Sequence, residues 1–184
     1  MNRHEQEEGW QCVSDMESTG IFHPYLHVEK SKLYLNEENL PLAAAEMEAV
    51  YPAYDSNVTI CCMAGEIALA EENFEQAEER FRKSLELRSS SHWACMGMAE
   101  ACLGLKKYEE AQKWVDQVLA EDRYSPRGQE LEEAIQEGRR EELKLAAEAD
   151  QASVKEKLDL AVIYIDKGEF ENASTLLTVF TAPD

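Results

Sequence analysis

The sequence has little of what marks an exported or membrane-spanning protein. Its first twenty residues contain five acidic side chains and no apolar run, so no secretory signal is expected there. No stretch approaches the roughly 18 apolar residues that a transmembrane helix needs. Cysteine is scarce and odd in number, with five in 184 residues, which argues against a disulfide framework. We therefore expect free thiols and a reducing, cytoplasmic setting.

Motifs that carry chemistry are also missing. There is no Gly-rich phosphate loop, no G-x-S-x-G and no H-E-x-x-H, and none of the four histidines has a partnered nucleophile. His92 and Cys95 have a spacing that puts two ligands on one helical face, which superficially suggests a metal site. Cys61 and Cys95 occupy the same position of a repeat described below, and buried core cysteines explain both more simply. The sequence predicts neither an enzyme nor a metal or cofactor.

The charge is strongly one-sided. Thirty-eight acidic residues against 18 basic ones give a net charge of −20, which repels phosphate backbones and anionic lipid surfaces. Nucleic acid and membranes are thus not expected as partners. The charge favours a protein partner with a basic or apolar segment, although it can also serve only to keep the outer face soluble.

What the sequence does contain is an internal repeat. Ala77 and Phe81 recur one period later as Ala111 and Val115, and Ala43 stands one period before Ala77. The aromatic ahead of the alanine and a glycine-bearing helix before it recur at the same interval. At least three copies are therefore in register.

A 34-residue helix-turn-helix period with small residues at fixed points resembles the tetratricopeptide repeat (TPR) family. A later copy carries the family's first-helix pattern most fully, as Leu160, Ala161 and Tyr164, followed by Ala173 and Leu177 in the second helix. The other copies are degenerate, because the small position is kept while the bulky ones vary. The resemblance implies an all-α fold, a TPR-like right-handed α-solenoid of about five helix-turn-helix units.

The expected organisation begins with residues 1–22, which are polar and are interpreted as a flexible acidic N-terminal arm. The TPR-like solenoid then occupies residues 23–184. Within the fourth copy Gly138 is interpreted as the turn between two helices, and a single long helix is the alternative. The copies lie near 24–57, 58–91, 92–125, an atypical 126–153, and 154–184.

In this family the first helix of each repeat lines a concave groove. The resemblance implies that the groove is mostly apolar and carries two acids, Glu66 and Glu100, at one repeat position. Two adjacent acids favour a basic group on the partner and repel a carboxylate, so the carboxylate clamp of some co-chaperones is not expected. The residues implied for the groove are Tyr25, Val28, Lys32, Leu35, Thr59, Cys62, Glu66, Leu69, Trp93, Met96, Glu100 and Leu103.

Two functions follow from this interpretation. The first is a protein-interaction module, an adaptor or chaperone that binds an apolar or basic-amphipathic segment of another protein in the groove, with Trp93 and Met96 as anchors unless they merely pack between helices. The second is a structural protein that self-associates, because the chain ends on Leu176, Leu177, Val179 and Phe180 without a polar capping helix.

Overall fold

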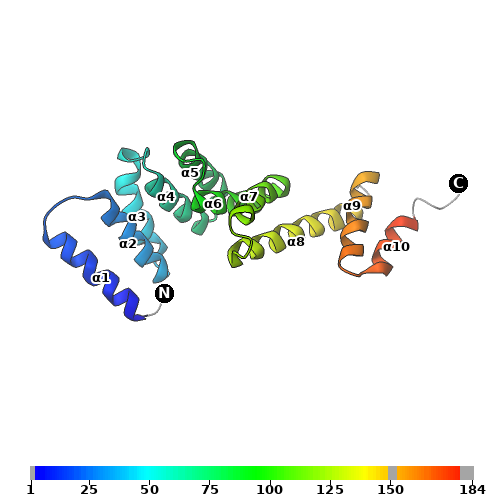
Figure 1. The fold of residues 1–184 in the computed structure, drawn as a ribbon, viewed down its shortest axis with the longest axis horizontal. Helices are drawn as coiled ribbons and strands as arrows, with labels where there is room; N and C mark the ends of the chain where they lie inside the picture. The colour runs from blue at the N-terminus through cyan, green and yellow to red at the C-terminus, as the bar shows by residue number, and fades with distance from the viewer. Residues whose placement is uncertain (1–2, 149–152, 179–184) are drawn as a thin grey trace. The chain divides into compact units, whose positions relative to one another are not determined.

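A computed structural model describes residues 3–148 and 153–178 of the chain (Figure 1). The described part is all-helical, with ten α-helices, one short 3-10 helix and no strand. The all-α class expected from the sequence is thereby confirmed. The helices are α1 Arg3–Ser18, α2 Pro24–Asn36, α3 Leu40–Val50, α4 Val58–Ala70, α5 Phe74–Leu87, α6 His92–Gly104, α7 Tyr108–Glu121, α8 Pro126–Glu148, α9 Val154–Asp166 and α10 Phe170–Thr178, with the 3-10 helix Tyr51–Ala53 after α3.

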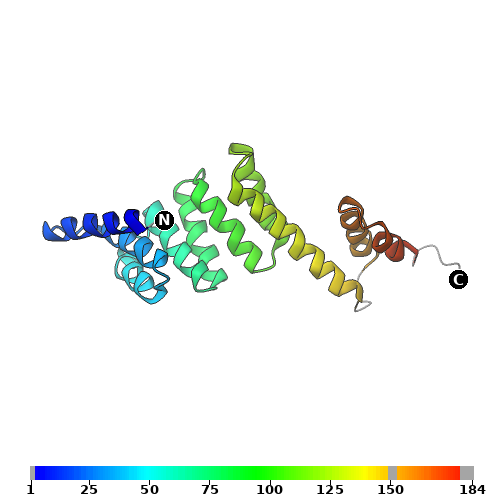
Figure 2. The ribbon, with the colours of Figure 1, turned by 90° about the horizontal axis from the view of Figure 1, so that it is seen from below.

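The chain divides into two compact units, an N-terminal unit Met1–Leu131 and a C-terminal unit Glu132–Asp184. In the N-terminal unit α2 to α7 form three helix pairs, coloured blue to green in Figures 1 and 2. Among the first helices of these pairs, α4 is a neighbour of both α2 and α6. We call α2, α4 and α6 the inner helices. In the C-terminal unit α9 packs on α10.

The turn inside each helix pair has one recurring backbone conformation. Glu38, Glu72 and Lys106 occupy the same repeat position and all have positive φ, between 56° and 57°, and Gly168 has φ 75° in the last pair. A left-handed residue commonly ends a helix, because it lets a following backbone amide reach back to a carbonyl of the last turn. Asn73 N, for example, donates to Ala68 O at 2.9 Å. The sharp turn that makes each pair antiparallel is therefore built locally.

The core of the N-terminal unit is organised by Phe81 of α5. A β-carbon on Gly65 of α4 would come within 2.7 Å of the Phe81 ring, and one on Gly97 of α6 within 2.2 Å. Both helices therefore approach the ring where they have no side chain. The repeated alanines also have the role that their small size suggests, because Ala43, Ala77, Ala111 and Ala173 are all buried.

The expectation of a flexible N-terminal arm is wrong for the described residues, since Arg3–Ser18 is a helix. Val13 of α1 is buried with Leu26 and Leu33 of α2, and Trp10 packs against this cluster. The Trp10 indole Nε1 also donates to Glu37 Oε1 at 2.6 Å. The apolar edge of α1 is only one or two residues wide per turn, which is why the sequence pattern did not reveal it.

The expected turn at Gly138 is wrong as well, because α8 continues through it as one helix. A glycine inside a helix costs about 1 kcal/mol relative to alanine, which strong helix formers such as its Glu, Arg and Leu neighbours offset.

In the C-terminal unit, Leu143 of α8 packs on a cluster of Leu160, Tyr164 and Ala173. The helix α9 begins with a capping box in which Ser153 and Glu156 satisfy each other's backbone amides.

Candidate protein-interaction face

The residues implied for a groove fall on the three inner helices at four recurring positions. The first position holds Tyr25, Thr59 and Trp93, the second Val28, Cys62 and Met96, the third Lys32, Glu66 and Glu100, and the fourth Leu35, Leu69 and Leu103. The side of α2, α4 and α6 that carries these positions is called the inner face below. The second position is buried, whereas the residues at the other three positions are half-buried or, for Tyr25, exposed.

The second position is part of the core, which corrects the sequence-based assignment. Val28, Cys62 and Met96 are all buried. Because α4 lies against both α2 and α6, side chains at this position face a neighbouring helix instead of solvent. The Cys62 sulfur lies 3.0 Å from Ser84 Oγ of α5, deep between the helices. These three residues are therefore not open to a partner.

The third position carries the two acids, and the chain itself supplies their partners. The indole Nε1 of Trp93 donates to Glu66 Oε1 at 2.7 Å. Arg127, in the first turn of α8, donates from Nε to Glu100 Oε1 at 2.7 Å, and its Nη2 lies 4.0 Å from Glu66 Oε2. The basic group that the sequence led us to expect on a partner is thus Arg127 of the chain itself.

These contacts follow the repeat. Arg127 comes one full period after Trp93, so both occupy the first position of their repeats. Each reaches back 27 residues to the acid of the preceding repeat. We call the two contacts, Trp93 to Glu66 and Arg127 to Glu100, the acid rungs. Extending the repeat count from Trp93 to Arg127 would have revealed the second rung from the sequence.

Burial and charge act in opposite directions on Glu100. Burial raises the pKa of its carboxyl, while Arg127 lowers it, and burial is the larger influence, so the pKa lies above the ordinary value of 4.5. The Glu100 side chain is 23% exposed and that of Arg127 is 52% exposed. Arg127 therefore covers the acid from the solvent side.

The remaining inner-face residues are partly open. Leu35, Leu69 and Leu103 are each half-buried, and Tyr25 is exposed. Trp93 is half-buried and packs against the core cluster, with Lys32 Nζ 6.0 Å from the centroid of its ring. The Tyr25 hydroxyl is hydrogen-bonded to Asn57, which lowers the pKa of the phenol. The inner face therefore presents a row of partly exposed leucines to solvent, with Lys32 near Trp93 and the two acids beside Arg127.

The C-terminal unit has a different surface at the corresponding positions. Counted from the first residue of each helix, Leu158, Val162 and Ile165 of α9 match Cys62, Glu66 and Leu69 of α4. All three residues of α9 are exposed. The sequence interpretation considered only the first three repeats and missed them, although the same count from the helix start would have found them.

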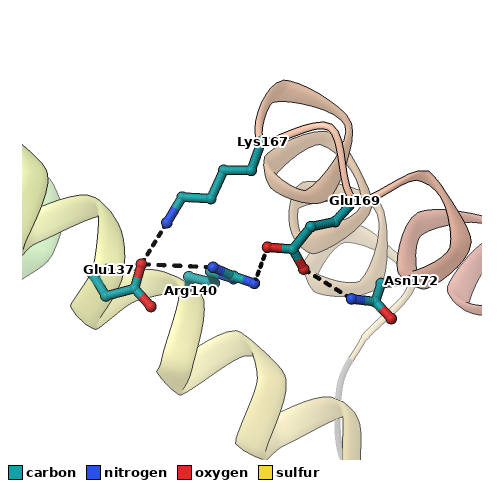
Figure 3. Close-up of polar contacts among 5 residues, drawn as sticks. All are labelled: Glu137, Arg140, Lys167, Glu169 and Asn172. Atoms are coloured by element: carbon teal, nitrogen blue, oxygen red, sulfur yellow. Dashed lines mark hydrogen bonds and ion pairs between the residues drawn. The ribbon is translucent and has the colours of Figure 1, made fainter.

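The C-terminal unit also holds an ionic network, shown in Figure 3. Arg140 of α8 pairs with Glu169 at 2.5 Å and with Glu137 at 3.7 Å, and Glu137 also pairs with Lys167. Asn172 Nδ2 donates to Glu169 at 2.8 Å. An open pocket of about 490 Å³ lies beside Arg140, but two acids already neutralise this guanidinium. The network ties α8 to the turn between α9 and α10.

The end of the chain was expected to be an uncapped apolar surface. Leu176 and Leu177 are half-buried in α10, and Leu176 packs on the α9–α10 cluster. Val179 and Phe180 lie outside the described residues.

The cysteines do not form a chemical centre. Cys61, Cys62, Cys95 and Cys102 are buried free thiols, and burial raises the pKa of each, to about 11 for Cys61 and Cys102. Cys12 is exposed. Within residues 3–148 and 153–178, no three His, Cys, Asp or Glu side chains gather in a way that could hold a metal ion. Nor does any helix in these ranges combine the length and apolar character needed to span a membrane.

Comparison with known proteins agrees with the fold. A tetratricopeptide repeat family model matches residues 68–135. No curated protein matches the chain significantly. Among solved structures, MamA residues 41-end from Desulfovibrio magneticus RS-1 is 18% identical, with a TM-score of 0.58 over 84% of this chain and 91% of that one. A tetratricopeptide repeat protein from Parabacteroides merdae is 14% identical, with a TM-score of 0.58 over 98% and 81%.

A third similar structure is the second TPR domain of human RPAP3 in complex with an HSP70 peptide, at 18% identity and a TM-score of 0.53. The similarity covers 61% of this chain and 98% of that domain. The tetratricopeptide repeat model thus matches residues 68–135, and the chain has the fold of the tetratricopeptide repeat protein and of the TPR domain among these solved structures.

Proposed function

We propose that this chain is a protein-interaction module, an adaptor or chaperone, that binds a segment of another protein along its inner face. One observation carries the proposal: the fourth position holds leucine in all three inner helices, Leu35, Leu69 and Leu103, and each is partly open to solvent. Apolar side chains repeated at one position of adjacent helices offer regularly spaced pockets to a bound segment. The RPAP3 domain, solved with a peptide, supports peptide binding by this fold.

The acid rungs refine the kind of segment proposed. Glu66 and Glu100 disfavour an acidic or carboxylate-ended segment, while Arg127 already supplies the nearest positive charge. A basic residue of a partner would have to compete with Arg127 for these acids. The net charge of −20 still attracts basic segments over longer distances. The proposed partner segment is therefore chiefly apolar, with basic residues at its edges.

The proposed cellular location of the chain is the cytoplasm, which cell fractionation would test.

Site-specific crosslinking tests the proposal without disturbing the acid rungs. A photoreactive phenylalanine analogue would replace Leu103 on the inner face or, as the matched control, Glu79, an exposed residue of α5. After irradiation in native cell extract, we expect a defined adduct with another protein only from position 103. Equal adducts from both positions, or none from position 103, would contradict binding at the inner face.

A further inference from the structure

The helix α9 exposes a continuous apolar row that nothing in the C-terminal unit covers in the described residues. Val154, Leu158, Val162 and Ile165 are between 45% and 60% exposed. We call this row the α9 stripe. The side of α9 that faces its own unit is separate, because Leu160, Ala161 and Tyr164 are buried there. The stripe is thus distinct from the side of α9 that packs inside the unit. Its size and continuity suit an interface between protein chains.

The stripe is complementary to itself when one copy is reversed. Its members follow at intervals of four, four and three residues, which confines them to about 80° of the helix circumference at roughly 100° per residue. In an antiparallel pair, Val154 of one copy lies opposite Ile165 of the other, and Leu158 lies opposite Val162. Every layer then joins two branched apolar side chains, and no polar residue falls between them.

The charged residues beside the stripe are also complementary to their own reversed copy. Lys155 and Asp166 are exposed, lie on the same flank of the stripe and stand at opposite ends of α9. Neither makes an ion pair within the part of the chain that the structure describes. Two antiparallel helices related by a two-fold axis bring equivalent flanks together, so Lys155 of each copy faces Asp166 of the other. In a parallel two-fold pair this flank would instead meet the opposite flank of the other copy, so Lys155 and Asp166 would not face each other.

We propose that two copies of this chain associate through their α9 stripes as an antiparallel, two-fold symmetric pair. A second copy is favoured over an unrelated partner because both the apolar row and the flanking charges match their own reversed image. One helix of 13 residues provides a small interface, so the association is weak and concentration-dependent. This surface is separate from the inner face of the N-terminal unit and does not depend on the function proposed there.

Sedimentation velocity of the full chain, from about 1 to about 200 µM, tests the proposal by mass action. The average mass of the wild type should rise from monomer toward dimer. Val162→Asp should keep the chain monomeric over the whole range. The matched control, Leu145→Asp, changes an exposed leucine of α8 outside the stripe and should dimerise like the wild type. A wild type that stays monomeric throughout, or a Val162→Asp variant that dimerises equally, would overturn the proposal.

Charge exchange then tests the antiparallel arrangement. Lys155→Asp alone and Asp166→Lys alone should each weaken dimerisation severalfold, because each creates two like-charge contacts. An equimolar mixture of the two variants should form mixed dimers more tightly than either variant alone. If mixing restores nothing, the charges do not face each other and the proposed pair is wrong. Far-UV circular dichroism confirms that every variant is folded, and the crosslink at position 103 should be unaffected by Val162→Asp.

Discussion

The inner helices α4 and α6 and the helix α9 carry matching repeat positions but opposite surfaces. On α4 and α6 the second position is buried and the third holds an acid that Trp93 or Arg127 covers. On α9 the same positions are Leu158 and Val162, and both are open to solvent. The repeat position alone therefore does not decide whether a side chain is available to a partner. Availability also depends on whether an adjacent inner helix covers the side chain and whether the next repeat supplies a hydrogen-bond donor to it. Within the described residues of its unit, α9 has neither an adjacent inner helix nor such a donor.

The largest expected difference between the units concerns two phenylalanines. Phe81 is fully buried between two glycines, so Phe81→Ala should lower the free energy of unfolding of the N-terminal unit by about 3–5 kcal/mol. Phe170, which is 67% exposed, serves as the control, and Phe170→Ala should change stability by less than about 0.5 kcal/mol.

Fluorescence can follow the N-terminal unit separately, because Trp10, Trp93 and Trp114 all belong to it. Urea unfolding should therefore be recorded both by tryptophan fluorescence and by circular dichroism, which sees every helix. A Phe81→Ala variant with wild-type stability by fluorescence would show that the ring does not organise this core.

A smaller effect is expected from opening an acid rung. Arg127→Ala leaves Glu100 without its cation in a mostly buried position, and we expect a loss of about 1 kcal/mol, between the values for exposed and buried pairs. Arg123→Ala, at an exposed site near the end of the preceding helix, is the matched control. If both substitutions cost the same in urea unfolding, the rung does not stabilise the inner face.

The pH dependence of Glu100 sharpens the same point. Because burial raises its pKa above 4.5, the folded chain keeps a proton that the unfolded chain has already released as pH rises past that value. This group therefore lowers wild-type stability with rising pH until the raised pKa is passed. Glu100→Gln lacks the titration, so its stability minus that of the wild type should increase over this window and then level off. A difference that is constant or decreases with pH would contradict the assignment.

The least disruptive comparison is between thiols. Cys12 is exposed on α1, whereas the other four cysteines are buried with raised pKa values, and a thiol reacts as the thiolate. With a disulfide reagent near neutral pH, one thiol should react quickly and four only after denaturant is added. Cys12→Ser should remove the fast phase alone. Rapid reaction of more than one thiol in the native protein would show that the inner helices open readily.

Much of this fold could be predicted from the sequence because small residues recur at a fixed position of its repeat. Ala43, Ala77 and Ala111 mark close helix packing, and the constant interval between them can be counted without any structure. The helix α1 could not be predicted in the same way. Its packing depends on Trp10 and Val13 meeting α2, which is tertiary information.

The candidate site was predicted less well. Whether Met96 faces solvent depends on how closely α4 and α6 approach each other. Glycine and alanine permit a close approach, but their presence in the sequence does not show that one occurs. Glu66 and Glu100 were recognised as a pair, yet their cation comes from Arg127, beyond the three repeats considered. A charge near a surface cannot be assigned to a partner until every residue of the next repeat has been placed.

Because of the acid rungs, a whole repeat could be deleted from the chain while the side-chain pairing is kept. Donor and acceptor recur once per period, so removing residues 92–125 would join Ser91 to Pro126 and set Arg127 at 27 residues from Glu66, the spacing of a native rung. The shortened protein would exchange a tryptophan for an arginine at that junction and retain its cap, because Ser91 holds the place that Ser125 holds before α8. A deletion that begins at the same point but removes a different length would move Arg127 away from the spacing of a native rung. Side-chain pairing as well as helix packing therefore favours the gain or loss of whole copies in such a chain.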